Sequence, residues 1–195
     1  MARPAKDARG ARPAKDARGV ALGLLLSACV LFTTALSATA AGTPAQKILA
    51  NRHSLLQSRE LWATVDVCNP AHEPNTVGIR GSMPGDGHDK DAMYMGFQLQ
   101  YLEATKGNVW VNLAHGADSG FVAVGAAKMA RQGGSSFQLG PAKGTTGYKL
   151  RGVVTFQWRR GGKVLHQVTR TTTAGHQSVA GADPAGYSAA ECTIG

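Results

Sequence analysis

The residues from Arg151 to Thr173 constrain the fold of this chain most strongly, because they have the pattern of a β-hairpin. β-Branched and aromatic residues precede Gly161-Gly162, and valine and threonine are frequent after it. A Gly-Gly pair adopts the positive φ angles that a two-residue hairpin turn requires. A turn centred there predicts three cross-strand pairs: Trp158 with Leu165, Gln157 with His166, and Arg160 with Lys163.

Alternation of apolar and polar residues continues through most of the chain after residue 60. The clearest example is Met93–Leu102, where every second residue from Met93 is apolar or aromatic. Turn signals separate the segments at residues 69–75, 84–91 and 133–136. The strands expected are residues 61–68, 77–83, 93–102, 109–113, 121–124, 137–139, 153–158, 164–173 and 187–194. About nine short strands predict an all-β domain over residues 61–195, folded as a single antiparallel β-sandwich.

Two short sequence patterns in the last quarter of the chain indicate which type of β-sandwich to expect. The chain resembles bacterial secreted immunoglobulin-like and fibronectin-III-like sandwich domains in three features. These are the spacing of its expected strands, the pair Phe156-x-Trp158, and Tyr187 shortly before Cys192. The resemblance covers Leu61–Ile194 and implies an immunoglobulin-like sandwich, but no particular function. The chain departs from true immunoglobulin domains, because Tyr187 lies five residues before the cysteine instead of two. The expected core contains all or some of these aromatic residues: Trp62, Phe97, Trp110, Phe156 and Trp158.

Residues 1–40 have the organisation of a secretory signal peptide. Residues 2–10 repeat as residues 11–19, which lengthens the basic n-region, and residues 20–41 carry no charge. Small residues before Ala41 predict cleavage at that point and a secreted protein. Two alternatives remain open: the apolar run is long enough to be retained as a membrane anchor, and residues 26–29, which end in Cys29, look like a bacterial lipidation site.

The basic repeat is also the one segment that suggests a nucleic-acid-binding arm, but it has no aromatic residue to stack on bases, so no specific nucleic-acid partner is expected. Removal of the leader takes away six of 21 basic and two of 12 acidic residues and leaves a net charge of +5. Residues 41–60 are expected to form a linker that is partly helical, since Thr43-Pro44 can cap a helix.

Cys68 and Cys192 are the cysteines that remain after the leader, and in an exported domain two cysteines are expected to form a disulfide. The alternative is a pair of buried free thiols. Cys68 lies on the polar face of its strand by alternation. The strand therefore bulges near Asp66, is covered on both faces, or ends before Cys68.

Three groups of residues have the chemistry of a metal or catalytic site. Carboxylates and a histidine crowd residues 86–91 and suit a Ca²⁺ loop: Asp86, His88, Asp89 and Asp91. Soft ligands for Cu(I) lie nearby: Met83, His88, Met93 and Met95. The residue types of a hydrolytic triad follow each other closely: His115, Asp118 and Ser119. A solvated loop is favoured for the first group and core packing for the second, and closeness in sequence is no evidence of triad geometry in the third. No cofactor is expected.

Candidate ligand contacts come from basic and aromatic residues. Five cations surround the hairpin and can form a patch for anionic polymers, with an ordinary solvated face as the alternative: Arg151, Arg159, Arg160, Lys163 and Arg170. Trp62 and Trp110 lie on the more polar faces of their strands and can stack on a sugar ring or contact a partner if they are exposed. The sequence thus predicts a secreted or cell-envelope binding or structural module without catalysis, whose partner is an extracellular protein or an anionic polymer. The alternative is a small extracellular hydrolase or metal-binding protein that uses Asp86–Asp91 or His115–Ser119.

Overall fold

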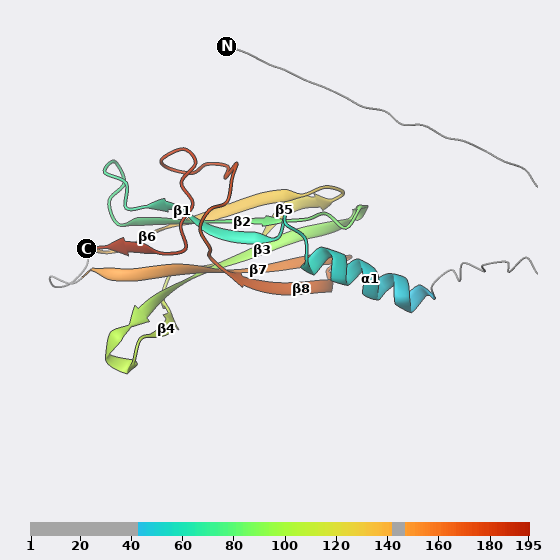
Figure 1. Ribbon diagram of the computed structural model, residues 1–195, viewed down its shortest axis with the longest axis horizontal. Helices are drawn as coiled ribbons and strands as arrows, with labels where there is room; N and C mark the ends of the chain where they lie inside the picture. The colour runs from blue at the N-terminus through green and yellow to red at the C-terminus, as the bar shows by residue number, and fades with distance from the viewer. Residues whose placement is uncertain (1–42, 142–146) are drawn as a thin grey trace, which may run out of the picture. The chain divides into compact units, whose positions relative to one another are not determined.

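The structure is a computed structural model that describes residues 43–141 and 147–195, so the expected leader lies outside the described residues. In this part of the chain, one α-helix, α1 (Pro44–Leu56), precedes nine β-strands (Figure 1). Within the described residues, no helix is long and apolar enough to cross a membrane. α1 occupies much of the segment expected to be a linker. It begins with a capping box, in which the Thr43 hydroxyl accepts from the Gln46 backbone N–H and the Gln46 side chain accepts from the Thr43 N–H.

The smaller sheet has three antiparallel strands in the order β1-β2-β6. These strands are β1 (Trp62–Cys68), β2 (Thr76–Met83) and β6 (Arg131–Gln138). The C-terminal segment pairs with the edge of β1 that does not face β2, since the Val65 and Ala189 backbones exchange two hydrogen bonds. The edge of β1 is therefore not open to solvent.

The larger sheet has six strands and is built around β3 (His88–Glu103) and β7 (Tyr148–Arg160). β5 (Asp118–Ala127) pairs with the first part of β3, and β4 (Val109–Asn112) pairs with its last four residues after the short 3₁₀ helix η1 (Ala104–Lys106). On the other side, β8 (Lys163–Thr171) pairs with the last part of β7 and β9 (Cys192–Ile194) with its first part. Every ladder is antiparallel.

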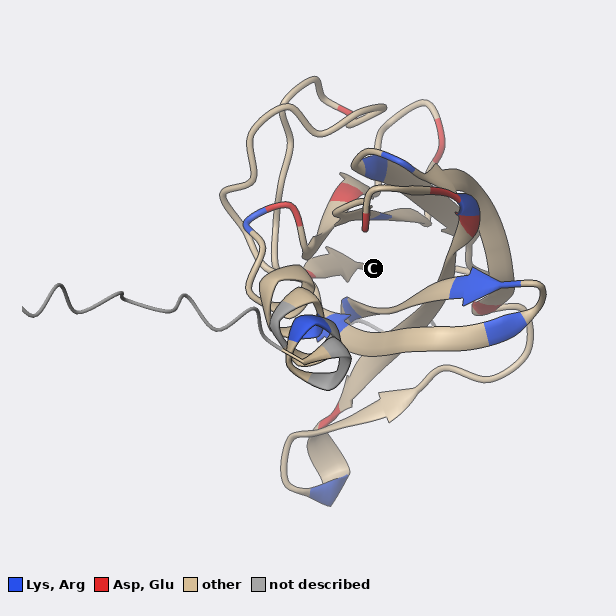
Figure 2. Ribbon diagram, turned by 90° about the vertical axis from the view of Figure 1, so that its right-hand side faces the viewer, with Lys and Arg blue, Asp and Glu red and all other residues tan. Residues whose placement is uncertain are grey.

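The two sheets pack on a common apolar interior, as the sequence predicts for an all-β sandwich. Viewed from its end, the domain has strands on all sides of this interior (Figure 2). Phe97, Phe156 and Trp158 are the buried aromatic residues of the central strands. The sheets approach closely at Gly152, where an added Cβ would lie 2.8 Å from the Ile79 side chain of the opposite sheet. Trp62 and Trp110 are only half-buried and lie outside this core.

The predicted hairpin forms with its turn at Gly161-Gly162, and Arg160 pairs with Lys163 as expected. The other two predicted pairs are wrong by one residue. A bulge between Trp158 and Arg159 leaves Leu165 without a direct partner, so Trp158 pairs with His166 and Gln157 with Gln167. The bulge brings the His166 ring edge-on to the Trp158 ring, with the centroids 6.3 Å apart.

One predicted turn and the second half of the predicted loop 84–91 are in fact strand. β3 begins at His88, inside the expected loop 84–91, and residues 133–136 belong to β6. The glycines of β6 serve close packing instead of a turn. An added Cβ at Gly133 would lie 2.7 Å from the Val124 side chain, and one at Gly134 would lie 2.8 Å from the Arg80 guanidinium. The last strand is shorter than expected, because only residues 192–194 pair with β7.

Cys68 and Cys192 form the predicted disulfide, which joins the end of β1 to β9 and therefore links the two sheets. Strict alternation would place Cys68 on the polar face of its strand. A bulge at Asp66, where the β1–β2 register shifts, changes this alternation before Cys68. β1 is also covered on both faces, since Thr64 and Asp66 are buried as fully as Val65. The Asp66 carboxylate accepts from the Arg80 guanidinium at 2.8 Å. Burial outweighs that interaction and raises the pKa of Asp66.

Candidate functional site

The outer face of the six-stranded sheet carries polar and aromatic side chains. We call it the arginine–aromatic face. Along β3, β7 and β8, the residues of this face alternate with residues that point toward the other sheet. The neighbouring strands β4 and β5 each add one aromatic residue to it. The residues of the face are Tyr94, Gln98, Gln100, Trp110, Phe121, Arg151, Thr155, Gln157, Arg159, Gln167 and Thr169.

One end of the face is a stack of an arginine on two aromatic rings. The Arg159 guanidinium lies 4.1 Å from the centre of the Tyr94 ring and 4.8 Å from that of Phe121. Gly96 makes room for this arrangement, since a Cβ there would lie 3.3 Å from the Phe121 ring. Arg159 Nε also donates to Gln157 Oε1 at 2.7 Å. Phe121 stays 45% exposed, so the stack is open to solvent.

The other end of the face repeats the arrangement with different residues. The Arg151 guanidinium lies 4.3 Å from the centre of the Trp110 ring, and its Nε donates to Gln100 Oε1 at 2.8 Å. Gln100 is held in turn, because its Nε2 donates to Asn112 Oδ1 at 2.9 Å. Burial beneath its neighbours lowers the pKa of Arg151, although the nearby Glu191 acts in the opposite direction.

Paired hydroxyl and amide side chains lie between the two stacks. The Thr155 and Thr169 hydroxyls are 3.1 Å apart, and Gln157 Nε2 donates to Gln167 Oε1. Arg151 and Arg159 are eight positions apart on β7, so at about 3.3 Å per residue their backbones are separated by roughly 26 Å. The face therefore presents two fixed guanidinium groups with hydrogen-bonding side chains between them.

The structure separates the ligand contacts predicted from the sequence. Trp110 and Arg159 lie on the arginine–aromatic face. Arg160 instead donates to Asp91. Lys163 is exposed at the hairpin tip, where basic residues flank the turn (Figure 2). Trp62 is elsewhere, stacked on His176 with ring centroids 4.5 Å apart. Sequence reasoning named Arg151 but missed Tyr94, Phe121 and the glutamines. Strand alternation places them on a polar face, but only the β3–β7 register shows that they are neighbours.

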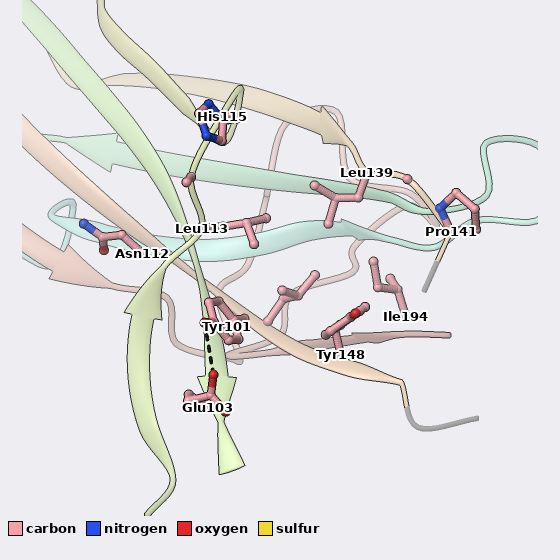
Figure 3. A pocket seen from close by; sticks show the side chains of 12 residues that line it. Tyr101, Glu103, Asn112, Leu113, His115, Leu139, Pro141, Tyr148 and Ile194 are labelled. Carbon is pink, nitrogen blue, oxygen red and sulfur yellow. Dashed lines mark hydrogen bonds between the residues drawn. The ribbon is translucent and has the colours of Figure 1, made fainter. Parts of the chain in front are cut away.

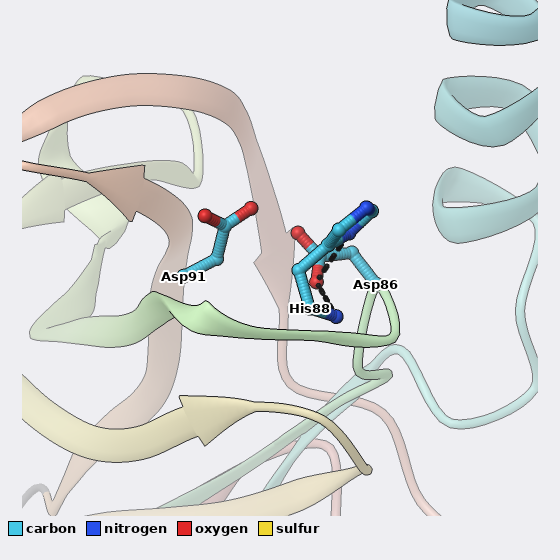
Figure 4. A group of neighbouring side chains, drawn as sticks. All are labelled: Asp86, His88 and Asp91. Carbon is cyan, nitrogen blue, oxygen red and sulfur yellow. Dashed lines mark hydrogen bonds and ion pairs between the residues drawn. The ribbon is translucent and has the colours of Figure 1, made fainter.

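The acidic group at residues 86–91 is brought together in part (Figure 4). Ligand atoms of Asp86, His88 and Asp91 lie within 4.8 Å of one another. Asp86 Oδ1 accepts from the His88 backbone N–H at 2.9 Å and lies 3.3 Å from His88 Nδ1. Asp89 points away and lies 3.4 Å from the Lys128 ammonium.

Arg160 already pairs with one of the carboxylates that this cluster could offer to a metal ion. Its guanidinium donates to both oxygens of the buried Asp91 carboxylate, which lowers the pKa of Asp91. Burial raises the pKa of Asp86, and the adjacent Asp91 carboxylate adds to that effect. A cation in this place would compete with Arg160 for Asp91. Of the predicted copper ligands, Met83, Met93 and Met95 are fully buried in the core, whereas His88 is exposed.

Two residues of the predicted triad, Asp118 and Ser119, are engaged with the backbone, whereas His115 is exposed. Asp118 Oδ1 accepts from the Gly120 N–H at 2.6 Å. Ser119 Oγ accepts from the Phe97 N–H at 3.0 Å and donates to the Gly120 carbonyl at 2.8 Å. Among the hydrogen bonds of residues 43–141 and 147–195, none joins the side chains of His115, Asp118 and Ser119. These contacts fix the start of β5 against β3.

A pocket that the sequence did not indicate opens between the sheets at one end of the sandwich (Figure 3). Its volume is about 690 Å³. Leu150 and Ile194 lie at its base, and the Tyr101 hydroxyl donates to Glu103 Oε2 at 3.2 Å on one wall. Its lining comes from five separate segments between residues 101 and 194, which explains why no local pattern revealed it.

A comparison of the chain with protein-family models and with curated proteins finds no match to either. The geometry of the arginine–aromatic face and of the pocket therefore supplies the argument about function.

Proposed function

We propose that this chain is an exported, non-catalytic binding module that holds an extended anionic polymer, such as an acidic cell-envelope polysaccharide, on its arginine–aromatic face. The observation that carries the proposal is the pair of arginine–aromatic stacks at opposite ends of one exposed sheet face. The proposed scaffold is an immunoglobulin-like sandwich, for which the two packed antiparallel sheets are the support.

Stacked arginines suit the recognition of anionic groups. A guanidinium that lies flat on an aromatic ring keeps its edge N–H groups available for two parallel hydrogen bonds to a carboxylate or phosphate. Arg151 and Arg159 are each further held by a glutamine side chain, so they lose little conformational freedom when an anion binds. Both positions therefore favour anionic groups presented in a defined orientation.

The spacing of the two arginines favours a polymer over a small molecule. A compact anion reaches one stack, whereas an extended chain with repeated negative charges spans both stacks across roughly 26 Å. The hydroxyl and amide groups of Thr155, Thr169 and Gln167 lie between the stacks and can hydrogen-bond to sugar hydroxyls. The net charge of +5 after removal of the leader adds a general attraction for polyanions.

Two features support the proposed location outside the cytoplasm. The Cys68–Cys192 disulfide suits an oxidising compartment. Residues 1–40 have the sequence pattern of a signal peptide, with retention as an anchor or lipidation at Cys29 as the alternatives. In each case the folded domain would meet the polymers of the cell surface.

The test compares wild type with the double variant Arg151→Gln/Arg159→Gln, both isolated after export. Affinity electrophoresis measures how strongly gels that contain polygalacturonate or neutral dextran retard each protein. We expect wild type to be retarded by polygalacturonate alone, and the double variant to bind at least about tenfold more weakly, since each substitution removes charge-assisted hydrogen bonds.

The matched control is Lys47→Gln/Arg52→Gln, which removes two exposed cations of α1 and the same net charge. It should bind polygalacturonate nearly as tightly as wild type. An equal loss in both double variants would show that binding depends only on net charge and would contradict the proposed face. Retardation by dextran to the same degree would contradict the proposed anionic ligand.

A further inference from the structure

We infer that the pocket at the end of the sandwich binds a small organic cation with an aromatic or aliphatic body, independently of the polymer proposed for the outer face. The pocket lies between the two sheets, whereas the arginine–aromatic face is on the outside of one of them. Its volume of about 690 Å³ lies within the range of small-molecule sites in proteins. The two sites share no arginine and call for ligands of opposite charge.

Most residues that line the pocket are apolar, although Glu103, Asn112 and His115 also line it. Leu150 and Ile194 form its base and are each only 1% exposed. Leu113 and Leu139 continue the apolar surface from the connection after β4 and the end of β6. Tyr148 stands at the rim, 41% exposed, so an aromatic face is available to a ligand (Figure 3). Such a lining takes up an apolar body of drug-like size because it removes apolar area from water.

Glu103 supplies a fixed negative group in this lining. Its Oε2 accepts from the Tyr101 hydroxyl at 3.2 Å, and its Oε1 accepts from the Thr105 hydroxyl at 2.6 Å and from the Thr105 N–H at 3.2 Å. The hydrogen bonds from Thr105 are the main reason why the pKa of Glu103 is lowered. The carboxylate is therefore ionised at neutral pH and held toward Tyr101.

The combination of one oriented carboxylate with tyrosine rings selects the charge of the ligand. An ammonium group is attracted both by the carboxylate and by the faces of Tyr101 and Tyr148. A carboxylate ligand of the same shape would meet repulsion from Glu103. The Lys106 ammonium also contributes to the lowered pKa of Glu103, and Lys106 is exposed on η1.

The test uses isothermal titration calorimetry of the exported protein with phenylbutylammonium and with phenylbutyrate, two probes of similar shape and opposite charge. We expect one phenylbutylammonium to bind per chain and phenylbutyrate to bind at least about tenfold more weakly, the ratio that 1.4 kcal/mol gives. Glu103→Gln should reduce this preference to about threefold or less, since the substitution removes both the attraction for the ammonium group and the repulsion of the carboxylate. Tyr148→Ala should weaken both probes.

Val164→Ala is the matched control, because Val164 is as exposed as Tyr148 but lies at the hairpin end and does not line the pocket. It should leave both affinities unchanged. Absence of saturable binding of either probe to wild type would overturn the inference, as would equal affinities for the two probes. Binding of polygalacturonate by Glu103→Gln should match that of wild type, so failure at this pocket is distinguishable from failure of the outer face.

Discussion

His176 shows how a single residue far along the chain fixes the environment of another. Its ring stacks on Trp62 at an angle of 12° between the planes, and Nε2 lies 2.7 Å from the Thr173 hydroxyl. Burial against these groups lowers the pKa of His176 below 6.5. The alternation of β1 predicts that Trp62 leaves the core side, but no sequence pattern predicts the histidine 114 positions later that covers it.

The lowered pKa of His176 gives a prediction at the residue scale. Between the folded-state pKa and 6.5, the unfolded chain binds a proton that the folded chain does not, so the free energy of unfolding rises with pH through that window and is lost on acidification. We expect the His176 ring resonances to titrate below those of a model peptide in an NMR pH series. We also expect His176→Gln to have a flatter pH dependence of the urea midpoint below pH 6.5 than wild type. A His176 pKa at or above 6.5 would contradict this account.

At the scale of the element, the β7–β8 hairpin was predicted well because its turn is encoded locally. Gly161 and Gly162 have φ angles of 54° and 80°, which two-residue turns of this type require. The bulge after Trp158 was not predictable, since an alternating sequence does not show which residue is left unpaired. Most of β6 was missed for a related reason, because Gly133 and Gly134 resemble a turn unless their close contacts with the Val124 and Arg80 side chains are known.

The hairpin turn allows a matched pair of substitutions. We expect Gly162→Val to lower the free energy of unfolding by about 1–2 kcal/mol, because a β-branched residue is strained at positive φ. Gly161→Asn should change it little, since asparagine adopts this conformation readily. Neither position has another atom within 4 Å of an added Cβ, so the difference reports backbone conformation and not crowding. Urea unfolding measures both values, and equal effects of the two substitutions would contradict the assignment of the turn.

At the scale of the molecule, the class of fold followed from strand alternation, but neither proposed binding site did. The arginine–aromatic face depends on the register between β3 and β7, which brings Tyr94 next to Gln157 and so under Arg159. The pocket depends on the packing that brings Leu139, Leu150 and Ile194 together from separate segments of the chain. Local sequence patterns determine which face of a strand is polar, whereas register and sheet packing determine which polar residues meet.

The disulfide is the one long-range contact that the sequence did predict, and it gives the last prediction. Cys68 and Cys192 are 124 positions apart, with Cα atoms 5.5 Å apart, and they join the first strand of one sheet to the last strand of the other. The bond restricts the unfolded chain, and the chain-entropy model gives about 4–5 kcal/mol for a loop of this length. We expect Cys68→Ser/Cys192→Ser to lose stability of that order in urea unfolding, and reduced wild type to match it. A loss below about 1 kcal/mol would contradict the chain-entropy account and would mean that the unfolded chain without the bond retains structure that keeps these two ends close.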